Sequence, residues 1–213
     1  MEIRLILVLS VFIATILFIV FAGKDIREKL VEGILNSTSM MIFIMYMMST
    51  TERICKAMFF NCDHSFLKHG YYREGNAILS NFETRLKRIV FINSIPAFGI
   101  ALALEIIVFI CGDFEDVVKL IPTLICIVSL AAFFSIYHLF MYYVLQPYTE
   151  ELTVKSPLFS ITNFFIYMIA YGSFQINTSS TIFTLIIIGV TVIFIPIALV
   201  IINKVAPRTF RLK

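Results

Sequence analysis

Six long apolar segments restrict the fold of this chain more than any other feature of its sequence. They are Leu5–Ala22, Ile34–Thr50, Ile89–Gly112, Leu120–Leu145, Leu158–Phe174 and Thr181–Ile202. Each is close to the roughly 20 residues that a helix needs to cross the hydrocarbon core of a bilayer. Lipid cannot satisfy open backbone groups, and the alternating pattern of a membrane β-strand is absent. The sequence therefore predicts an all-α, polytopic membrane bundle of about six transmembrane helices, formed as a single domain over residues 1–213.

The composition argues against a soluble catalytic domain. Of the 213 residues, 60% are hydrophobic and 15% are charged, unlike the proportions of ordinary soluble proteins. The P-loop motif GxxxxGK[ST] is absent, as are HExxH and GxSxG. The cysteines form no CxxC pair, and the set Cys55, Cys62, His64 and His69 has the spacing of no common zinc module. We therefore expect neither enzyme activity nor a bound cofactor or metal, and any energy for transport must come from another chain or a gradient.

The distribution of lysine and arginine predicts the orientation in the membrane. If the polar stretch between the second and third apolar segments is cytosolic, thirteen of the basic residues lie inside and four outside. The inside group is Arg4, Arg53, Lys56, Lys68, Arg73, Arg85, Lys87, Arg88, Lys155, Lys204, Arg208, Arg211 and Lys213, and the outside group is Lys24, Arg27, Lys29 and Lys119. Positive charge collects on the cytosolic side of membrane proteins. We therefore expect both termini in the cytosol. The net charge of +3 forms no basic run, so no nucleic-acid partner is predicted.

The polar stretch over residues 51–88 is predicted to be a cytosolic helical hairpin. Its first helix covers Cys55–His69 and stops at Gly70, and a second helix begins at Asn76. The second is amphipathic and leads into the third span, with an apolar stripe made by Ile78, Phe82, Leu86 and Ile89. Such an element either lies on the lipid of the inner leaflet or docks on a soluble partner. The aromatic residues of the first half, predicted to be exposed, favour a partner: Phe59, Phe60, Phe66, Tyr71 and Tyr72.

Part of this stretch resembles a group of bacterial ABC exporter permeases whose ATPase is a separate chain. The similar residues lie between Phe59 and Ala97, under a fifth of the chain, and elsewhere only the topology of ABC-2-type exporters agrees. They are Asn61-Cys62-Asp63-His64-Ser65-Phe66-Leu67, Tyr71-Tyr72-Arg73, Ile78-Leu79, Phe82-Glu83-Thr84-Arg85-Leu86-Lys87 and Ile92-Asn93-Ser94-Ile95-Pro96-Ala97. The chain is short for that group, which leaves open whether it is a complete permease or one half of a longer one.

The resemblance implies a transmembrane subunit in a bacterial plasma membrane, coupled to an ABC ATPase through the cytosolic segment 51–88. It also implies a second permease half, as a homodimer or a heterodimer. The residues expected to contact the ATPase are Asn61, Asp63, Phe66, Leu67, Tyr71, Tyr72 and Arg73. The alternative is an accessory or scaffold membrane protein without transport activity, and a gradient-driven carrier is disfavoured because the spans carry few charges. The transported substrate is not predicted.

Two ionisable residues inside the predicted spans are candidates for a translocation path. Glu105 lies in the third apolar segment and His138 in the fourth, and ionisable groups at such depth often face a cavity or a partner. The alternative for Glu105 is a structural role, either as an acid near the outer interface or as a protonated, hydrogen-bonded acid. For His138 it is a neutral side chain bonded to a neighbouring helix, because no acidic partner for a proton relay is evident in the sequence.

Overall fold

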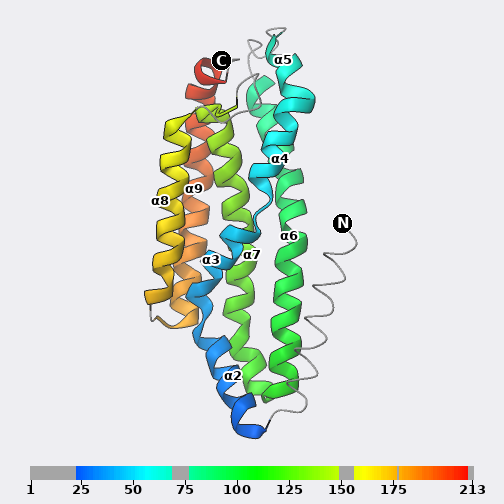
Figure 1. Ribbon diagram of the computed structural model, residues 1–213, viewed down its shortest axis with the longest axis vertical. Helices are drawn as coiled ribbons and strands as arrows, with labels where there is room; N and C mark the ends of the chain where they lie inside the picture. Colours follow the sequence, from blue (N-terminus) through cyan, green and yellow to red (C-terminus); the bar gives the residue numbers. More distant parts are fainter. Residues whose placement is uncertain (1–22, 69–76, 149–155, 177, 211–213) are drawn as a thin grey trace.

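In the computed structural model, the regular elements are helices. The structure describes residues 23–68, 77–148, 156–176 and 178–210, and no strand occurs within them. The predicted all-α class is therefore confirmed. Four long elements run side by side along the length of the molecule (Figure 1), namely α6 (Ala77–Cys111), α7 (Phe114–Leu145), α8 (Pro157–Gly172) with the short η4 (Ser173–Gln175), and α9 (Ser180–Thr209).

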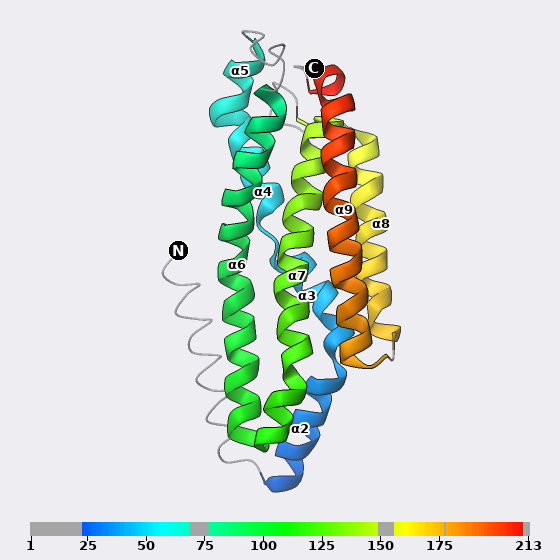
Figure 2. The same ribbon diagram turned by 180° about the vertical axis from the view of Figure 1, so that it is seen from behind.

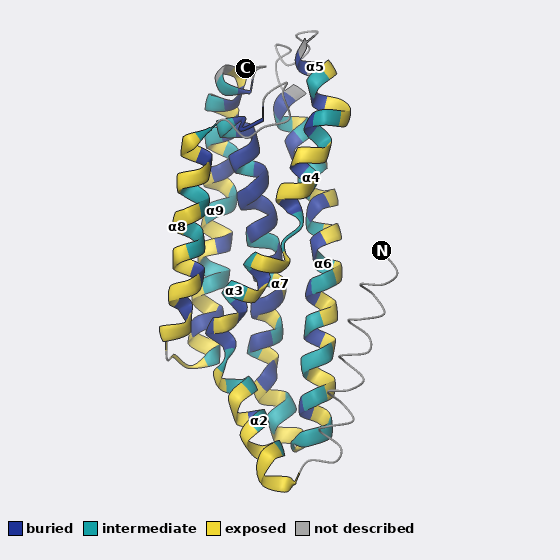
Figure 3. Cartoon of the chain, viewed as in Figure 1, coloured by how far each residue is buried: buried dark blue, intermediate teal, exposed yellow. Residues whose placement is uncertain are grey.

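Helix α7 is the centre of this bundle. It packs most extensively against α6 and α9, and these two helices flank it when the molecule is seen from behind (Figure 2). Figure 3 shows burial concentrated along α7, whereas the outer helices expose much of their surface. The exposed side chains include many large apolar ones, such as Phe91, Phe109, Phe164 and Leu185. An apolar exterior around a packed centre is the arrangement that a bilayer favours, because lipid replaces water outside.

Four helices in the described part of the chain are long and apolar enough to cross a membrane. They are Ile78–Cys111, Phe114–Leu145, Pro157–Gln175 and Ser180–Pro207, and a bent helix pair raises the number to five if it counts as one span. The four helices contain the last four predicted apolar segments, apart from Gly112, which immediately follows α6. The first predicted segment, Leu5–Ala22, lies outside the described residues. The total of six spans therefore stays a prediction.

The second apolar segment is not the single helix that was predicted from Ile34 to Thr50. Helix α2 (Lys24–Asn36) starts earlier, and α3 (Met41–Met48) follows the short η1 (Thr38–Met40) after a bend of 57°. Hydroxyl groups from η1, α7 and α9 stabilise the bend. The Thr38 hydroxyl lies 2.7 Å from that of Thr123 and donates to the Ser180 hydroxyl over 2.8 Å, and Ser180 donates to a carbonyl of α2. The last of these contacts satisfies a backbone carbonyl that the broken helix leaves open.

A second break, between α3 and α4 (Thr51–Met58), is held by one side chain from α6. The Asn93 amide oxygen accepts hydrogen bonds from the Thr50 hydroxyl at 2.8 Å and from the Thr50 backbone N–H at 3.3 Å. Its amide nitrogen donates to Thr51 and, at 2.8 Å, to Ser135 of α7. Asn93 therefore joins three helices at the point where the chain leaves α3.

The stretch predicted as a hairpin is helical in both of its described parts. After α4 come the π-helical η2 (Phe59–Asp63) and α5 (His64–Lys68), so the first helix begins at Thr51 and not at Cys55. Helix α6 begins at Ala77, one residue after the predicted start, and continues unbroken to Cys111. The predicted amphipathic helix and the third span are therefore one continuous helix. Residues 69–76, which would join the two parts, lie outside the described residues.

Candidate functional site

The segment made by α4, η2 and α5 packs against one end of the bundle through a buried stripe. Every fourth residue along it is buried: Thr51, Cys55, Phe59, Asp63 and Leu67. In an α-helix of 3.6 residues per turn, a four-residue spacing drifts by about 40° at each step. The wider π-helical turn of η2 counteracts that drift, because it holds more residues per turn. The stripe therefore stays on one face over the whole segment.

Aromatic side chains fill the interface between this segment and the helix ends. The segment and the helix ends share one buried core, which consists of Cys55, Phe59, Leu67, Ile78, Phe82, Ile89, Leu139, Tyr142, Tyr143, Tyr148, Ile202, Ala206 and Phe210. The Phe59 ring lies 5.1 Å from that of Phe60 and 5.7 Å from that of Tyr148. The prediction that Phe59 and Phe60 are both exposed is wrong, because Phe59 is fully buried and Phe60 half-buried. Their apolar rings face the helix ends.

The polar centre of this interface is an ion pair between Asp63 and Arg85. Asp63, the last residue of η2, is 1% exposed, and both of its oxygens accept hydrogen bonds from the Arg85 guanidinium of α6, at 2.5 and 2.6 Å. The Tyr142 hydroxyl donates to the same carboxylate at 2.5 Å, and Arg85 also donates to the Tyr143 hydroxyl at 3.1 Å. Three parts of the chain therefore meet at one carboxylate.

This network is a stable arrangement for buried charge. A two-bond guanidinium–carboxylate pair is geometrically specific, and the tyrosine hydroxyls satisfy further lone pairs and protons. The Arg85 guanidinium also lies 5.9 Å from the centre of the Tyr143 ring. The pairing of Asp63 with Arg85 was not predicted, because 22 positions separate the two residues in the sequence. The four-residue periodicity of the buried stripe is the signal that could have shown Asp63 to be buried.

The predicted ATPase-contacting residues differ in their exposure. Asn61 is exposed, and its side-chain amide donates to the Ala57 carbonyl at 2.9 Å. Asp63 and Leu67 are buried within the chain, so a direct contact with a partner does not fit their position. The Phe66 side chain and the three residues Tyr71, Tyr72 and Arg73 lie outside the part of the structure that is described.

The two predicted path residues are not brought together. Glu105 is exposed on α6 beside exposed apolar residues such as Leu102 and Phe109. His138 of α7 is buried instead among the rings of Tyr46, Phe134 and Tyr137. A hydrogen bond from His138 to a neighbouring helix was the alternative prediction, but its Nδ1 atom has no partner. The two side chains therefore form no common site.

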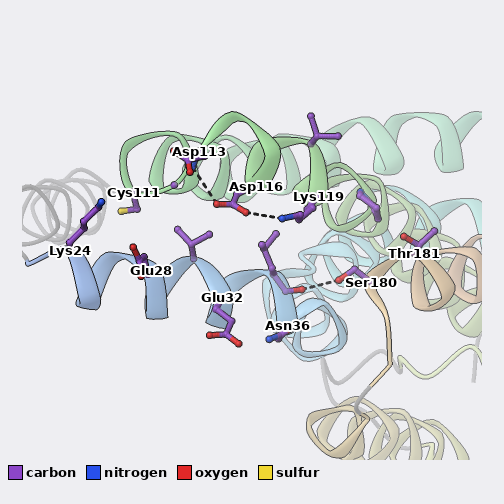
Figure 4. Close-up of a pocket in the computed structure, with 15 residues that line it drawn as sticks. Lys24, Glu28, Glu32, Asn36, Cys111, Asp113, Asp116, Lys119, Ser180 and Thr181 are labelled. Atoms are coloured by element: carbon purple, nitrogen blue, oxygen red, sulfur yellow. Dashed lines mark hydrogen bonds and ion pairs between the residues drawn. The ribbon is translucent and has the colours of Figure 1, made fainter.

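At the opposite end of the bundle, a polar hollow of about 770 Å³ lies between α2 and the start of α7. Figure 4 shows Lys24 and Glu28 of α2 on the side that faces the junction of α6 and α7, whereas the Glu32 side chain points away from it. On α7, Lys119 pairs with Asp116 at 3.3 Å, and Asp116 in turn forms a capping box with Asp113. The hollow carries both signs of charge. It is separate from the ion-pair network and adds no residue to it.

Comparisons with known proteins do not identify a relative. No protein-family model, curated protein or solved structure matches this chain. The class of protein is therefore defined by its own helices. It is a helical membrane protein with four membrane-capable helices in its described part, or five if the bent pair of α2 with the helices that follow it is one span.

Proposed function

We propose that this protein is the transmembrane subunit of an ATP-driven ABC exporter, coupled to a separate ATPase through residues 51–88. The observation that carries the proposal is the buried network of Asp63, Arg85 and Tyr142. It links the proposed docking segment to α6 and α7 through short, charge-assisted bonds and not through apolar contact alone. A displacement imposed on the segment is then transmitted to both helices. The resemblance of the stretch from Phe59 to Ala97, which contains Asp63 and Arg85, to exporter permeases supports this role.

In this proposal, the residues of the segment have two different tasks. The exposed face, which includes Asn61 and Cys62, contacts the ATPase together with Tyr71, Tyr72 and Arg73. The buried face, with Asp63 and Leu67, transmits the motion to the bundle and does not touch the partner. A second permease half completes the exporter, because the two ATPase subunits of such a machine close on each other and each moves its own permease half.

The ATPase contact can be tested with the full-length chain as bait, solubilised from its own cell membrane in mild detergent. We expect it to recover a separate chain that hydrolyses ATP. Changing Arg73→Glu should reduce that recovery by about tenfold, as expected for loss of a charged interface contact. Lys204→Glu is the matched control, because Lys204 is exposed on α9 outside the segment. Recovery of other membrane proteins but no ATPase would instead favour the accessory or scaffold protein.

The orientation can be tested with two cysteines at opposite ends of the bundle. Cys62 is exposed on η2, and Cys111 is half-buried at the other end of α6. A membrane-impermeant thiol reagent should label Cys111 on intact cells and label Cys62 only after permeabilisation. Labelling is read by mass spectrometry, with Cys62→Ser and Cys111→Ser as controls, while the buried Cys55 and Cys126 should stay unlabelled. Labelling of Cys62 on intact cells would place the docking segment on the outer side of the membrane and would contradict the proposal.

A further inference from the structure

A pocket of about 290 Å³ lies beside the break between α3 and α4, apart from the ion-pair network. Its lining combines charged, polar and aromatic groups from α3, α4 and α7. The polar and aromatic side chains that line it include Tyr46, Glu52, Arg53, Lys56 and His138. The break itself, held by Asn93, turns the start of α4 and so brings charged side chains next to the buried end of α7. The pocket is therefore a product of the tertiary fold.

One side chain that lines this pocket, His138, has a buried nitrogen atom without a hydrogen-bond partner. His138 is 5% exposed, and its Nδ1 atom has no hydrogen-bond partner. The ring is held in place by aromatic neighbours, with the Tyr137 ring at 5.0 Å and the Tyr46 ring at 6.2 Å. Buried polar nitrogen atoms are nearly always hydrogen-bonded, because an unpaired one loses its contact with water without replacement. Because His138 is one of the residues that line the pocket, we take a ligand bound there as the partner that this nitrogen lacks.

The charges around the pocket indicate the chemistry of that ligand. Arg53 and Lys56 are three residues apart on α4 and so lie on the same side of the helix, close to Glu52. None of the three forms an ion pair within the described residues. With a neutral histidine, the pocket has one positive charge in excess, which matches a singly charged anion. Glu52 can in addition accept a hydrogen bond from a donor group on the same ligand.

The depth of the pocket indicates where the ligand comes from. The apolar part of α7 begins at Leu120, and the helix rises about 27 Å from there to His138 at 1.5 Å per residue, close to the thickness of the roughly 30 Å hydrocarbon core. If α7 enters the hydrocarbon at Leu120, His138 lies near the opposite boundary of the hydrocarbon core, next to the lipid headgroups. The neighbouring Arg53 and Lys56 then have the depth at which cations meet lipid phosphate.

We propose that this pocket binds a singly charged phosphate group, with a phosphodiester of a phospholipid headgroup as the ligand that its depth favours. Arg53 and Lys56 supply the charge, and His138 Nδ1, carrying its proton, donates a hydrogen bond to a phosphate oxygen. Glu52 accepts a hydrogen bond from a hydroxyl or ammonium group of the same headgroup. This site is additional to the proposed exporter function and does not depend on it.

The proposal can be tested by native mass spectrometry of the full-length protein in detergent. The probes are phosphatidylglycerol and a diacylglycerol with the same acyl chains, which lacks the phosphate. We expect one phosphatidylglycerol to bind at least tenfold more tightly than diacylglycerol. The Arg53→Gln/Lys56→Gln double variant should bind phosphatidylglycerol about tenfold more weakly than the unchanged protein. His138→Phe should weaken the binding by a similar factor. Lys204→Gln, which removes an exposed cation at the same end of the bundle, should bind as the unchanged protein does.

A competition experiment with inorganic phosphate shows whether the phosphate group comes from a lipid headgroup or from a soluble phosphate compound. If millimolar phosphate displaces phosphatidylglycerol, the site accepts soluble phosphate compounds, and if it does not, the site is specific for the lipid. Equal binding of phosphatidylglycerol and diacylglycerol, or unchanged binding by the Arg53→Gln/Lys56→Gln variant, would overturn the proposal. If the double variant bound phosphatidylglycerol more weakly but His138→Phe bound it as tightly as the unchanged protein, the role given to the buried nitrogen would be overturned. The double variant changes exposed residues only, so the test does not depend on His138→Phe folding.

Discussion

Replacing Arg85 with methionine is expected to lower the free energy of unfolding by about 3–5 kcal/mol. Asp63 is almost completely buried, and Arg85 is its charged partner. Without the guanidinium, the carboxylate keeps only the hydrogen bond from Tyr142, so a buried charge is left uncompensated. The loss can be measured by chemical unfolding in detergent micelles. The loss of helix content reports unfolding of the whole bundle. The reactivity of Cys55, which lies in the same core, reports release of the segment from the bundle.

Two further variants separate the ion pair from general damage. Arg88→Met removes an exposed arginine of the same helix and should change stability by less than about 0.5 kcal/mol. Adding Asp63→Asn to Arg85→Met should recover part of the loss, because the amide carries no charge that needs a partner. A double-mutant cycle over Asp63 and Arg85 then measures their coupling. If Arg85→Met were as stable as Arg88→Met, the ion pair would not hold the segment on the bundle.

Replacing Phe59 with alanine should have an effect of similar size, about 3–5 kcal/mol. The Phe59 side chain is completely buried between the segment and the helix ends, and its ring contacts those of Phe60 and Tyr148. Removing it leaves a cavity at the centre of the aromatic interface. We expect a lower unfolding midpoint and faster labelling of Cys55, measured in a Cys62→Ser background so that the exposed cysteine does not contribute.

Phe91→Ala is the matched control for this prediction. The Phe91 side chain is 72% exposed on α6, so its removal takes away little packing and should change stability by about 0.5 kcal/mol or less. Phe59→Leu fills part of the cavity and should fall between the two alanine variants. If Phe59→Ala and Phe91→Ala had the same stability, the segment would not be packed on the bundle as described.

The long helices α6 to α9 were largely predictable from the sequence. A span must contain about 20 apolar residues, and its hydrogen bonds are all local, so the pattern of a single segment is enough to predict it. The start of α6 at Ala77 was predicted within one residue from the apolar stripe that begins at Ile78. Local patterns also predicted that the stretch after the second apolar segment is helical.

The breaks and the buried charge could not be predicted in the same way, because their partners are distant in the sequence. The bend after α2 depends on Thr123 and Ser180, and the break before α4 depends on Asn93. Asp63 was expected to contact an ATPase, as the resemblance to exporter permeases implies, and such a contact requires an accessible side chain. Its burial requires Arg85, 22 positions away, and the nearby tyrosine pair of α7.

The sequence by itself therefore determined the class of this protein, a helical bundle with an apolar exterior, because bilayer crossing is a property of each segment alone. Only the tertiary structure decided which polar residues are internal. A buried carboxylate is stable only where a guanidinium and hydroxyl groups from other helices meet it. The pocket around His138 has the same origin, since its charges come from α4 and its unpaired nitrogen from α7.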